Sequence, residues 1–355
     1  MQMGLRWFGT GFDKIPLEYI RQIPNVKGIV TTLYDKQAGD KWERERIRGL
    51  KEEAGRYGLK ILGIESVNIH DSIKTGEPER DKHIETYIET LTMLAEEGID
   101  TVCYNFMPVF DWTRSDLAKV RTDGATVFSY DQDLIDEVDP AQMFDKMDGS
   151  SNGYLLPGWE PERMARIKDL FDMYSHVDQE LLFKNLEYFL KAIIPTCEKT
   201  GIKMAIHPDD PGWPVFGLPR IASTRENLKR IVEMVPSPSN GLTVCTGSLG
   251  SNTDNDIPSI IRELGDTIHF AHVRNIIHHG PGKFDEAAHL SADGSLDMFE
   301  IMKAFYDTGF DGIMRPDHGR DIWGEKGMPG YGLYDRALGV AYLNGIWESL
   351  EKTYP

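Results

Sequence analysis

Hydrophobic positions along the chain fall into two kinds of segment that alternate. Short runs rich in Val, Ile, Leu and aromatic residues have the length and composition of buried strands, and amphipathic stretches follow most of them. The eight predicted strands span residues 3–9, 26–33, 59–66, 99–106, 202–208, 241–247, 267–275 and 310–319. The main predicted helices span residues 41–57, 79–97, 178–200, 224–235, 256–264, 295–308 and 333–351.

This alternation is typical of an α/β protein with a (β/α)8 TIM barrel. A doubly wound parallel sheet is the alternative, but no glycine-rich dinucleotide loop follows the first predicted strand. The strand count therefore favours the barrel. We predict one TIM-barrel domain over residues 1–355.

One region interrupts the alternation, a long insertion after the fourth strand at about residues 107–177. Apart from a predicted helix around residues 160–171, it mixes aromatic, acidic, Gly and Pro residues, and loops of this length are uncommon unless they are functional. It is either a surface insertion or a lid over the barrel mouth. Its aromatic residues Tyr130, Tyr154 and Trp159 would suit a sugar-sized ligand.

Composition narrows the classes of partner. The 355 residues include 57 acidic and 39 basic side chains, which give a net charge of -18. This charge argues against binding to nucleic acid or to an anionic membrane, because both rely on clustered Lys and Arg. Three widely spaced cysteines do not form a disulfide framework, and there is neither an apolar leader nor a run of 18 apolar residues. We therefore expect a cytoplasmic protein.

Four side chains that can bind metal stand at the ends of the last four predicted strands: His207, Cys245, His272 and Asp317. Taken singly, each has an ordinary alternative as a small buried thiol, a satisfied polar group or a turn cap. Their spacings of 38, 27 and 45 residues each correspond to about one β/α unit. Since these strand ends meet at one mouth of a barrel, the coincidence favours a metal site.

The ligand types restrict the metal. Two imidazoles, a thiolate and a carboxylate suit Fe²⁺, Mn²⁺, Co²⁺ or Zn²⁺ and are poor for Mg²⁺. The closely paired cysteines of structural zinc sites are absent from the sequence. Ligands at an open barrel mouth indicate a catalytic ion with free positions for substrate. The small residues Thr246, Gly247 and Ser248 after Cys245 would leave room for that substrate.

Other polar residues at the same mouth are candidates for proton transfer and substrate binding. His318 follows Asp317 directly, and Tyr331 lies in a glycine-rich loop that could fold over the site; Tyr334, three residues later, is expected to pack on the final helix. The candidate substrate-binding residues are Arg6, Trp7, Asn105, Arg274 and Asn275. The two arginines could instead pair with the surplus acids.

The motifs "HPDDPGWPVFGLPRI", "TVCTGSLG", "HVRN" and "RPDHG", with the opening segment, resemble the D-mannonate dehydratases of hexuronate (glucuronate) catabolism. The resemblance runs from Met3 to the final helix. It implies a barrel related to the xylose-isomerase-like sugar enzymes, a homodimer, and one divalent ion per chain, Mn²⁺ or Fe²⁺. It also implies conversion of D-mannonate to 2-keto-3-deoxy-D-gluconate.

The family's site residues fall on positions of this sequence. The resemblance places its acid–base pair on His318 and Tyr331, and its metal ligands on His207, Cys245, His272 and Asp317. A sugar isomerase or epimerase of the same superfamily is one alternative, although such sites are typically rich in carboxylates and the cysteine speaks against them. A barrel that binds a sugar acid without turning it over is another alternative, and the presence of His318 and Tyr331 argues against it.

Overall fold

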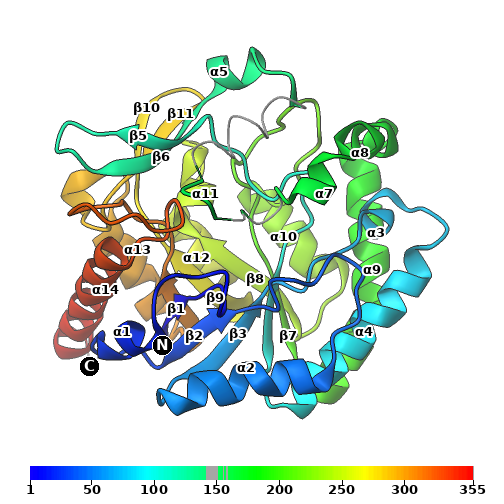
Figure 1. The fold of residues 1–355 in the computed structure, drawn as a ribbon, viewed down its shortest axis with the longest axis horizontal. Coiled ribbons are helices and arrows are strands. Elements are labelled where there is room, and N and C mark those ends of the chain that lie inside the picture. Colours follow the sequence, from blue (N-terminus) through cyan, green and yellow to red (C-terminus); the bar gives the residue numbers. More distant parts are fainter. Residues whose placement is uncertain (141–150, 155, 157–158, 355) are drawn as a thin grey trace.

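The eight predicted strands form a closed parallel barrel in the order β1-β12-β9-β8-β7-β4-β3-β2 (Figure 1). The structure, a computed structural model, describes residues 1–140, 151–154, 156 and 159–354. The barrel prediction is confirmed. The barrel strands are β1 (Gln2–Arg6), β2 (Gly28–Thr31), β3 (Lys60–Glu65), β4 (Thr101–Tyr104), β7 (Lys203–Ile206), β8 (Asn240–Cys245), β9 (Ile268–Val273) and β12 (Ile313–Pro316).

All seven predicted helices form close to their predicted bounds. They are α2 (Arg44–Arg56), α4 (Arg80–Glu96), α9 (Gln179–Thr200), α10 (Arg225–Met234), α12 (Ile257–Leu264), α13 (Met298–Asp307) and α14 (Leu333–Thr353). Side chains cap the N-termini of some of these helices: the Thr224 hydroxyl accepts a hydrogen bond from the Asn227 amide, and the Asp256 carboxylate accepts one from the Ser259 amide. Within the described residues, no helix combines the length and the apolar character needed to cross a membrane.

The sequence pattern did not predict three short helices outside the insertion: α1 (Leu17–Gln22), α3 (Asp71–Thr75) and α11 (Thr246–Ser251). The last of these begins at Thr246, so the strand predicted over residues 241–247 ends two residues earlier than predicted. The residues of α11 are too few and too small to show an apolar periodicity.

The insertion after β4 contains much more regular structure than predicted. It supplies the hairpin β5 (Asp116–Val120) and β6 (Thr126–Asp131), followed by α5 (Gln132–Asp136), and its predicted helix is split into α7 (Pro161–Met164) and α8 (Ile167–Tyr174). A second hairpin, β10 (Ile276–Gly280) and β11 (Lys283–Glu286), follows β9, between the predicted strand over residues 267–275 and the predicted helix over residues 295–308. Residues 141–150, 155 and 157–158 of the predicted insertion lie outside the described residues.

The two hairpins pair with each other into a small antiparallel sheet of order β10-β11-β6-β5. The pairing of β6 with β11 joins segments more than 150 residues apart, because Tyr130 lies opposite Phe284. Figure 1 shows this sheet at one end of the barrel, with α7 and α8 at the other side of the same end. The barrel mouth is thus bordered by the insertion after β4 and by the hairpin after β9.

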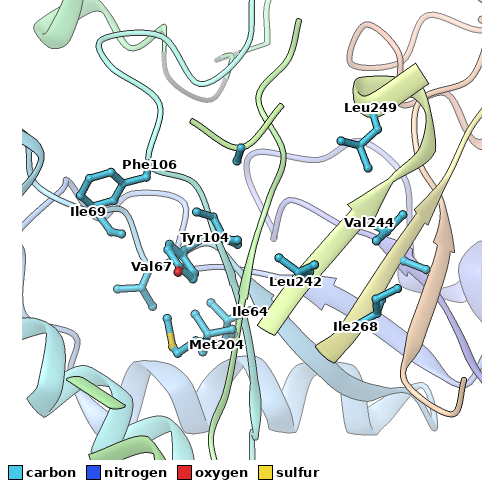
Figure 2. Packing of buried hydrophobic residues seen from close by; sticks show 14 of the residues in the cluster. Ile64, Val67, Ile69, Tyr104, Phe106, Met204, Leu242, Val244, Leu249 and Ile268 are labelled. Carbon is cyan, nitrogen blue, oxygen red and sulfur yellow. The ribbon is translucent and has the colours of Figure 1, made fainter. Parts of the chain in front are cut away.

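The barrel strands are buried on both faces, as is typical of parallel sheets covered by helices. Every residue of β8 and β9 is buried. Figure 2 shows part of this packing, with Val67, Tyr104 and Met204 on one flank and Leu242 and Val244 on the other. Such close packing fixes the strand register, and the register in turn fixes which side chains meet at the mouth.

Candidate active site

The four predicted ligands come from four strands that are neighbours in the barrel, β7, β8, β9 and β12. Cys245 ends β8 and is the register partner of His272 on β9. His272 is also the partner of Arg315 on β12, two residues before Asp317. His207 directly follows β7, and its amide bonds to the Tyr104 carbonyl of the neighbouring strand. Barrel closure therefore brings the four side chains together.

Their donor atoms lie close enough to surround one ion. His207 Nε2 lies 3.1 Å from His272 Nδ1, and Cys245 Sγ lies 3.3 Å from Asp317 Oδ2. The distance from His272 Nδ1 to Asp317 Oδ1 is 3.8 Å. Donor atoms of His207, Cys245 and His272 all lie within 4.8 Å of one another.

The protonation of His207 fits metal binding. Its Nδ1 lies 2.7 Å from the Pro208 carbonyl oxygen, which can only accept a hydrogen bond. Nδ1 therefore carries the proton, and the lone pair of Nε2 points at the cluster. A ligating histidine typically has this arrangement, with its second nitrogen donating to a carbonyl or carboxylate.

Asp317 is held as an anion. Arg315 Nη1 lies 2.8 Å from Asp317 Oδ1, and Arg274 Nη1 lies 3.0 Å from Oδ2. Burial by itself would raise the pKa of Asp317, but the charges of His318, Arg315, His272 and Arg274 hold that pKa well below its usual value. The carboxylate is therefore available as a ligand throughout the physiological pH range.

A second group of possible donors, Glu65, Cys103 and His272, lies beside the first. Glu65 is already paired: Arg315 Nη2 lies 2.9 Å from Glu65 Oε1, and Arg6 Nη1 lies 3.9 Å from Oε2. Burial raises the pKa of the Cys103 thiol well above its usual value, so this second group offers a protonated thiol rather than a thiolate. The group of His207, Cys245 and His272 is better suited to hold a metal ion.

A cavity of about 90 Å³ opens next to these donors at the carboxyl ends of the strands. Among its lining residues are the two cations Arg6 and Arg274 and four carboxylates. These carboxylates belong to Glu65, Asp111, Asp210 and Asp317. A divalent ion would offset this excess of negative charge, which would otherwise repel a sugar acid. The electrostatics and the donor atoms thus agree with a metal site.

The proposed acid and base are in contact at the edge of the cavity. His318 Nε2 lies 3.0 Å from the Tyr331 hydroxyl oxygen, and both residues line the cavity. Burial raises the pKa of Tyr331, so this phenol remains protonated at neutral pH. Tyr334 is 45% exposed and is not the packing residue we expected. The geometry favours Tyr331 of the two tyrosines.

The other side of His318 is held by residues that the sequence did not single out for this role. Its Nδ1 lies 2.9 Å from Arg274 Nη1 and 3.3 Å from Glu286 Oε1. Glu286 ends β11 and also accepts from Arg114 of the first insertion at 3.0 Å. Phe128 of β6 packs edge-on against the imidazole, with ring centroids 5.1 Å apart. Both hairpins therefore contribute to the position of His318.

Three of the five predicted substrate-binding residues line the cavity: Arg6, Asn105 and Arg274. The structure places the other two elsewhere. The Trp7 indole donates to the Ile15 carbonyl at 3.1 Å inside the core. The Asn275 amide ties β10 to its surroundings through the Leu290 carbonyl and the Leu296 amide, each at 3.0 Å. Both residues follow a barrel strand, but their side chains turn away from the mouth.

Two further expectations from the sequence need correction. A side chain at Gly247 would collide with Arg274, so the small residue there makes room for a protein side chain rather than for substrate. The aromatic residues Tyr130, Tyr154 and Trp159 are buried in the main hydrophobic core. The aromatic residues that line the cavity are instead Phe8, Tyr104, Trp112 and Tyr331.

Comparison with known proteins gives matches over the whole chain. The family profile described as D-mannonate dehydratase (UxuA) matches residues 1–355. A mannonate dehydratase from Brachyspira hyodysenteriae is 66% identical over 352 residues, which cover 99% of each chain. One from Geobacillus thermodenitrificans is 53% identical over 354 residues, covering 99% of this chain and 95% of the relative.

Solved structures agree with the sequence comparison. The mannonate dehydratase from Streptococcus suis serotype 2 matches with a TM-score of 0.90 at 42% identity, covering 100% of this chain and 96% of that chain. A D-tagatose 3-epimerase-like protein matches with a TM-score of 0.58 at 15% identity, which shows a shared fold alone. The full-length profile match and the close relatives show that the chain belongs to the D-mannonate dehydratase family.

Proposed function

We propose that this protein, a hydro-lyase of the mannonate dehydratase family, removes water from D-mannonate to give 2-keto-3-deoxy-D-gluconate. The donor cluster of His207, Cys245 and His272 beside the contact between His318 and Tyr331 carries the proposal. The candidate metal ligands thus adjoin the cavity that the two proton-transfer groups line, and His207 belongs to both. Asp317 completes the proposed ligand set, and Mn²⁺ or Fe²⁺ is the proposed ion.

The reaction requires removal of the C2 proton next to a carboxylate and loss of the C3 hydroxyl as water. Bound at the cluster, a divalent ion would act as a Lewis acid that stabilises negative charge on the substrate oxygens. His318 and Tyr331 share the two proton transfers: one takes the C2 proton and the other protonates the departing hydroxyl. The enol that results at C2 and C3 becomes the 2-keto-3-deoxy product by moving a proton to C3.

Arg274 supports this chemistry from within the cavity wall. It bridges Asp210 at 2.9 Å and Asp317 at 3.0 Å, and it contacts His318. Since these carboxylates already compensate its charge, we propose that Arg274 orients Asp317 and His318 rather than providing a free cation. The substrate carboxylate would therefore depend on the metal ion for most of its charge compensation.

The decisive experiment incubates the purified protein with D-mannonate after loading with Mn²⁺ or Fe²⁺. We expect a 2-keto-3-deoxy sugar acid, identified by NMR, and loss of turnover on chelation that is restored by adding the ion back. An isomerase or epimerase would instead give a product of unchanged formula, and a binding protein would give none. Absence of the dehydrated product with both ions would refute the proposal. A cytoplasmic location and a homodimer remain predictions.

A further inference from the structure

A second, larger cavity adjoins the catalytic one. Its volume is about 580 Å³, within the roughly 300–1,000 Å³ that small-molecule pockets occupy, whereas the catalytic cavity, about 90 Å³, falls below that range. It is lined by the segments that follow β2, β3 and β4 and by residues of α7 and α8. The two cavities share Asn105 and Asp111. A substrate held at the metal cluster can therefore extend past these two residues.

Asp111 stands at the junction of the two spaces. It lines the catalytic cavity, the large cavity and a small pocket of about 30 Å³ between them. Among the residues that the structure describes, no hydrogen bond or ion pair to its carboxylate is found. Asn105 is half-buried next to it, and its side-chain oxygen accepts from the Met107 amide at 3.3 Å.

Of the four cationic residues that line the large cavity, Arg166 is exposed and the other three contact other groups. Lys36 pairs with Glu43 at 2.8 Å, and Arg163 pairs with Asp71 at 2.6 Å. The ammonium group of Lys74, a buried residue, donates to the Met107 carbonyl at 2.9 Å. The junction therefore presents an unpaired carboxylate and an amide, which suit hydroxyl groups as hydrogen-bond partners.

We propose that Asp111 binds the hydroxyl groups at the C5–C6 end of the sugar acid and discriminates against sugar acids that carry a second carboxylate there. This inference rests on the proposed function, which places the C1–C3 end at the metal ligands and His318. A six-carbon chain held in this way reaches beyond the small catalytic cavity toward Asp111. A carboxylate accepts hydrogen bonds from hydroxyls, whereas a second carboxylate at C6 would be repelled.

The test compares Asp111→Asn with the wild type on three substrates, each with the metal-loaded enzyme. They are D-mannonate, the corresponding diacid with a carboxylate at C6, and a four-carbon aldonate with the same configuration at C2 and C3. We expect Asp111→Asn to raise KM for D-mannonate about tenfold, with kcat changed by less than about twofold, because a hydrogen bond to a charged group is lost. The preference in kcat/KM for D-mannonate over both other substrates should fall about tenfold.

Two further variants make the result specific. Asp111→Glu keeps the charge but moves the carboxylate, so it should retain discrimination against the diacid while raising KM for D-mannonate. Asp169→Asn removes the same charge from the exposed side of α8 and should match the wild type on all three substrates. If the wild type dehydrates D-mannonate and Asp111→Asn leaves both preferences within about twofold, the inference is wrong and the proposed function stands. If the wild type gives no dehydrated product, both fail.

Discussion

The floor and the roof of the catalytic cavity are built differently. The floor consists of side chains at the ends of neighbouring barrel strands, where Cys245 and His272 are fully buried and are register partners. The roof comes from the insertion after β4 and from the hairpin after β9. These two parts meet through the pairing of β6 with β11. Floor residues are fixed by a closed sheet, whereas roof residues such as Phe128 are fixed by packing between separate segments.

This difference predicts how each part responds to mutation. The floor combines buried charges in contact, such as Asp317 with Arg315 and Arg274, so removal of one member leaves others uncompensated. The roof also contains a buried ion pair, Arg114 with Glu286 at 3.0 Å, but neither of these residues is a proposed metal ligand. We therefore expect floor mutations to abolish chemistry and roof mutations to reduce it.

The largest effect is expected from Cys245→Ala. Loss of the thiolate removes one ligand from the donor cluster. The affinity of the protein for the metal ion should therefore fall at least a hundredfold, and turnover should be lost. Metal analysis after dialysis, together with the D-mannonate assay, measures both. Cys197→Ala, a buried thiol on α9 outside the cavity, is the matched control and should keep its metal. Stoichiometric metal in Cys245→Ala would disprove the ligand assignment.

The next effect concerns proton transfer at the boundary of floor and roof. His318→Asn and Tyr331→Phe should each retain metal but lower kcat by about 10²–10⁴, the usual contribution of a general acid or base. Metal content and single-turnover rates separate these roles from metal loss. Tyr334→Phe, on the exposed side of α14, serves as the control and should match the wild type. Rates near the wild type in both site variants would reject the assignment.

A smaller effect is expected where the roof positions His318. Phe128→Ala removes the ring that packs against the imidazole and against Trp112, whose ring centroid is 5.3 Å away. We expect kcat to fall about tenfold, with a loss of stability below the roughly 3–5 kcal/mol typical of a core Phe→Ala change. Phe128→Leu should restore most of the rate, and Val120→Ala, 68% exposed on β5, should change neither. An unchanged kcat in Phe128→Ala would show that the roof does not position His318.

The smallest effect is expected at the junction between the roof and the loop that carries Tyr331. The Asp321 backbone pairs with Thr126 of β6, while burial and the neighbouring Glu325 raise the pKa of the Asp321 carboxyl to about 7. An unfolded Asp has a pKa of about 3.9. The folded protein therefore keeps a proton that the unfolded chain releases, and the free energy of unfolding should fall as pH rises from about 4 to 7.

Asp321→Asn removes this dependence. We expect the variant to exceed the wild type in free energy of unfolding by about 1–2 kcal/mol at pH 8, and by little at pH 4. Urea unfolding at the two pH values measures the difference. Val120→Ala, an exposed change on β5 that involves no titratable group, should differ from the wild type equally at the two pH values. A difference between Asp321→Asn and the wild type that does not change with pH would contradict the raised pKa.

Much of the floor could be predicted because it follows local patterns. The eight apolar runs identified the barrel strands, and the residues at their ends identified His207, Cys245, His272 and Asp317. Arg315 and Asp210 stand in the same strand-end motifs and could have been marked by the same reasoning, since "RPDHG" and "HPDD" contain them. Trp7 and Asn275 were wrongly expected at the mouth, because position after a strand does not fix the direction of a side chain.

The roof could not be predicted for a physical reason. Pairing of β6 with β11 joins segments more than 150 residues apart, and short two-stranded hairpins become stable only when they pair further or pack. The contacts of Glu286 and Phe128 with His318 depend on that pairing. The large cavity beside Asp111 depends instead on the packing of α7 and α8 against the segments that follow the first four barrel strands.

The sequence by itself determined the barrel and the types and order of its candidate metal ligands, because strand periodicity and strand-end position are local properties of the chain. Tertiary structure decided which of these groups touch. It set the 3.1 Å contact of His207 with His272 and the 3.0 Å contact of His318 with Tyr331, and it placed an unpaired carboxylate at the mouth of a second cavity. These distances depend on barrel closure and on the packing of the insertions, which no local pattern encodes.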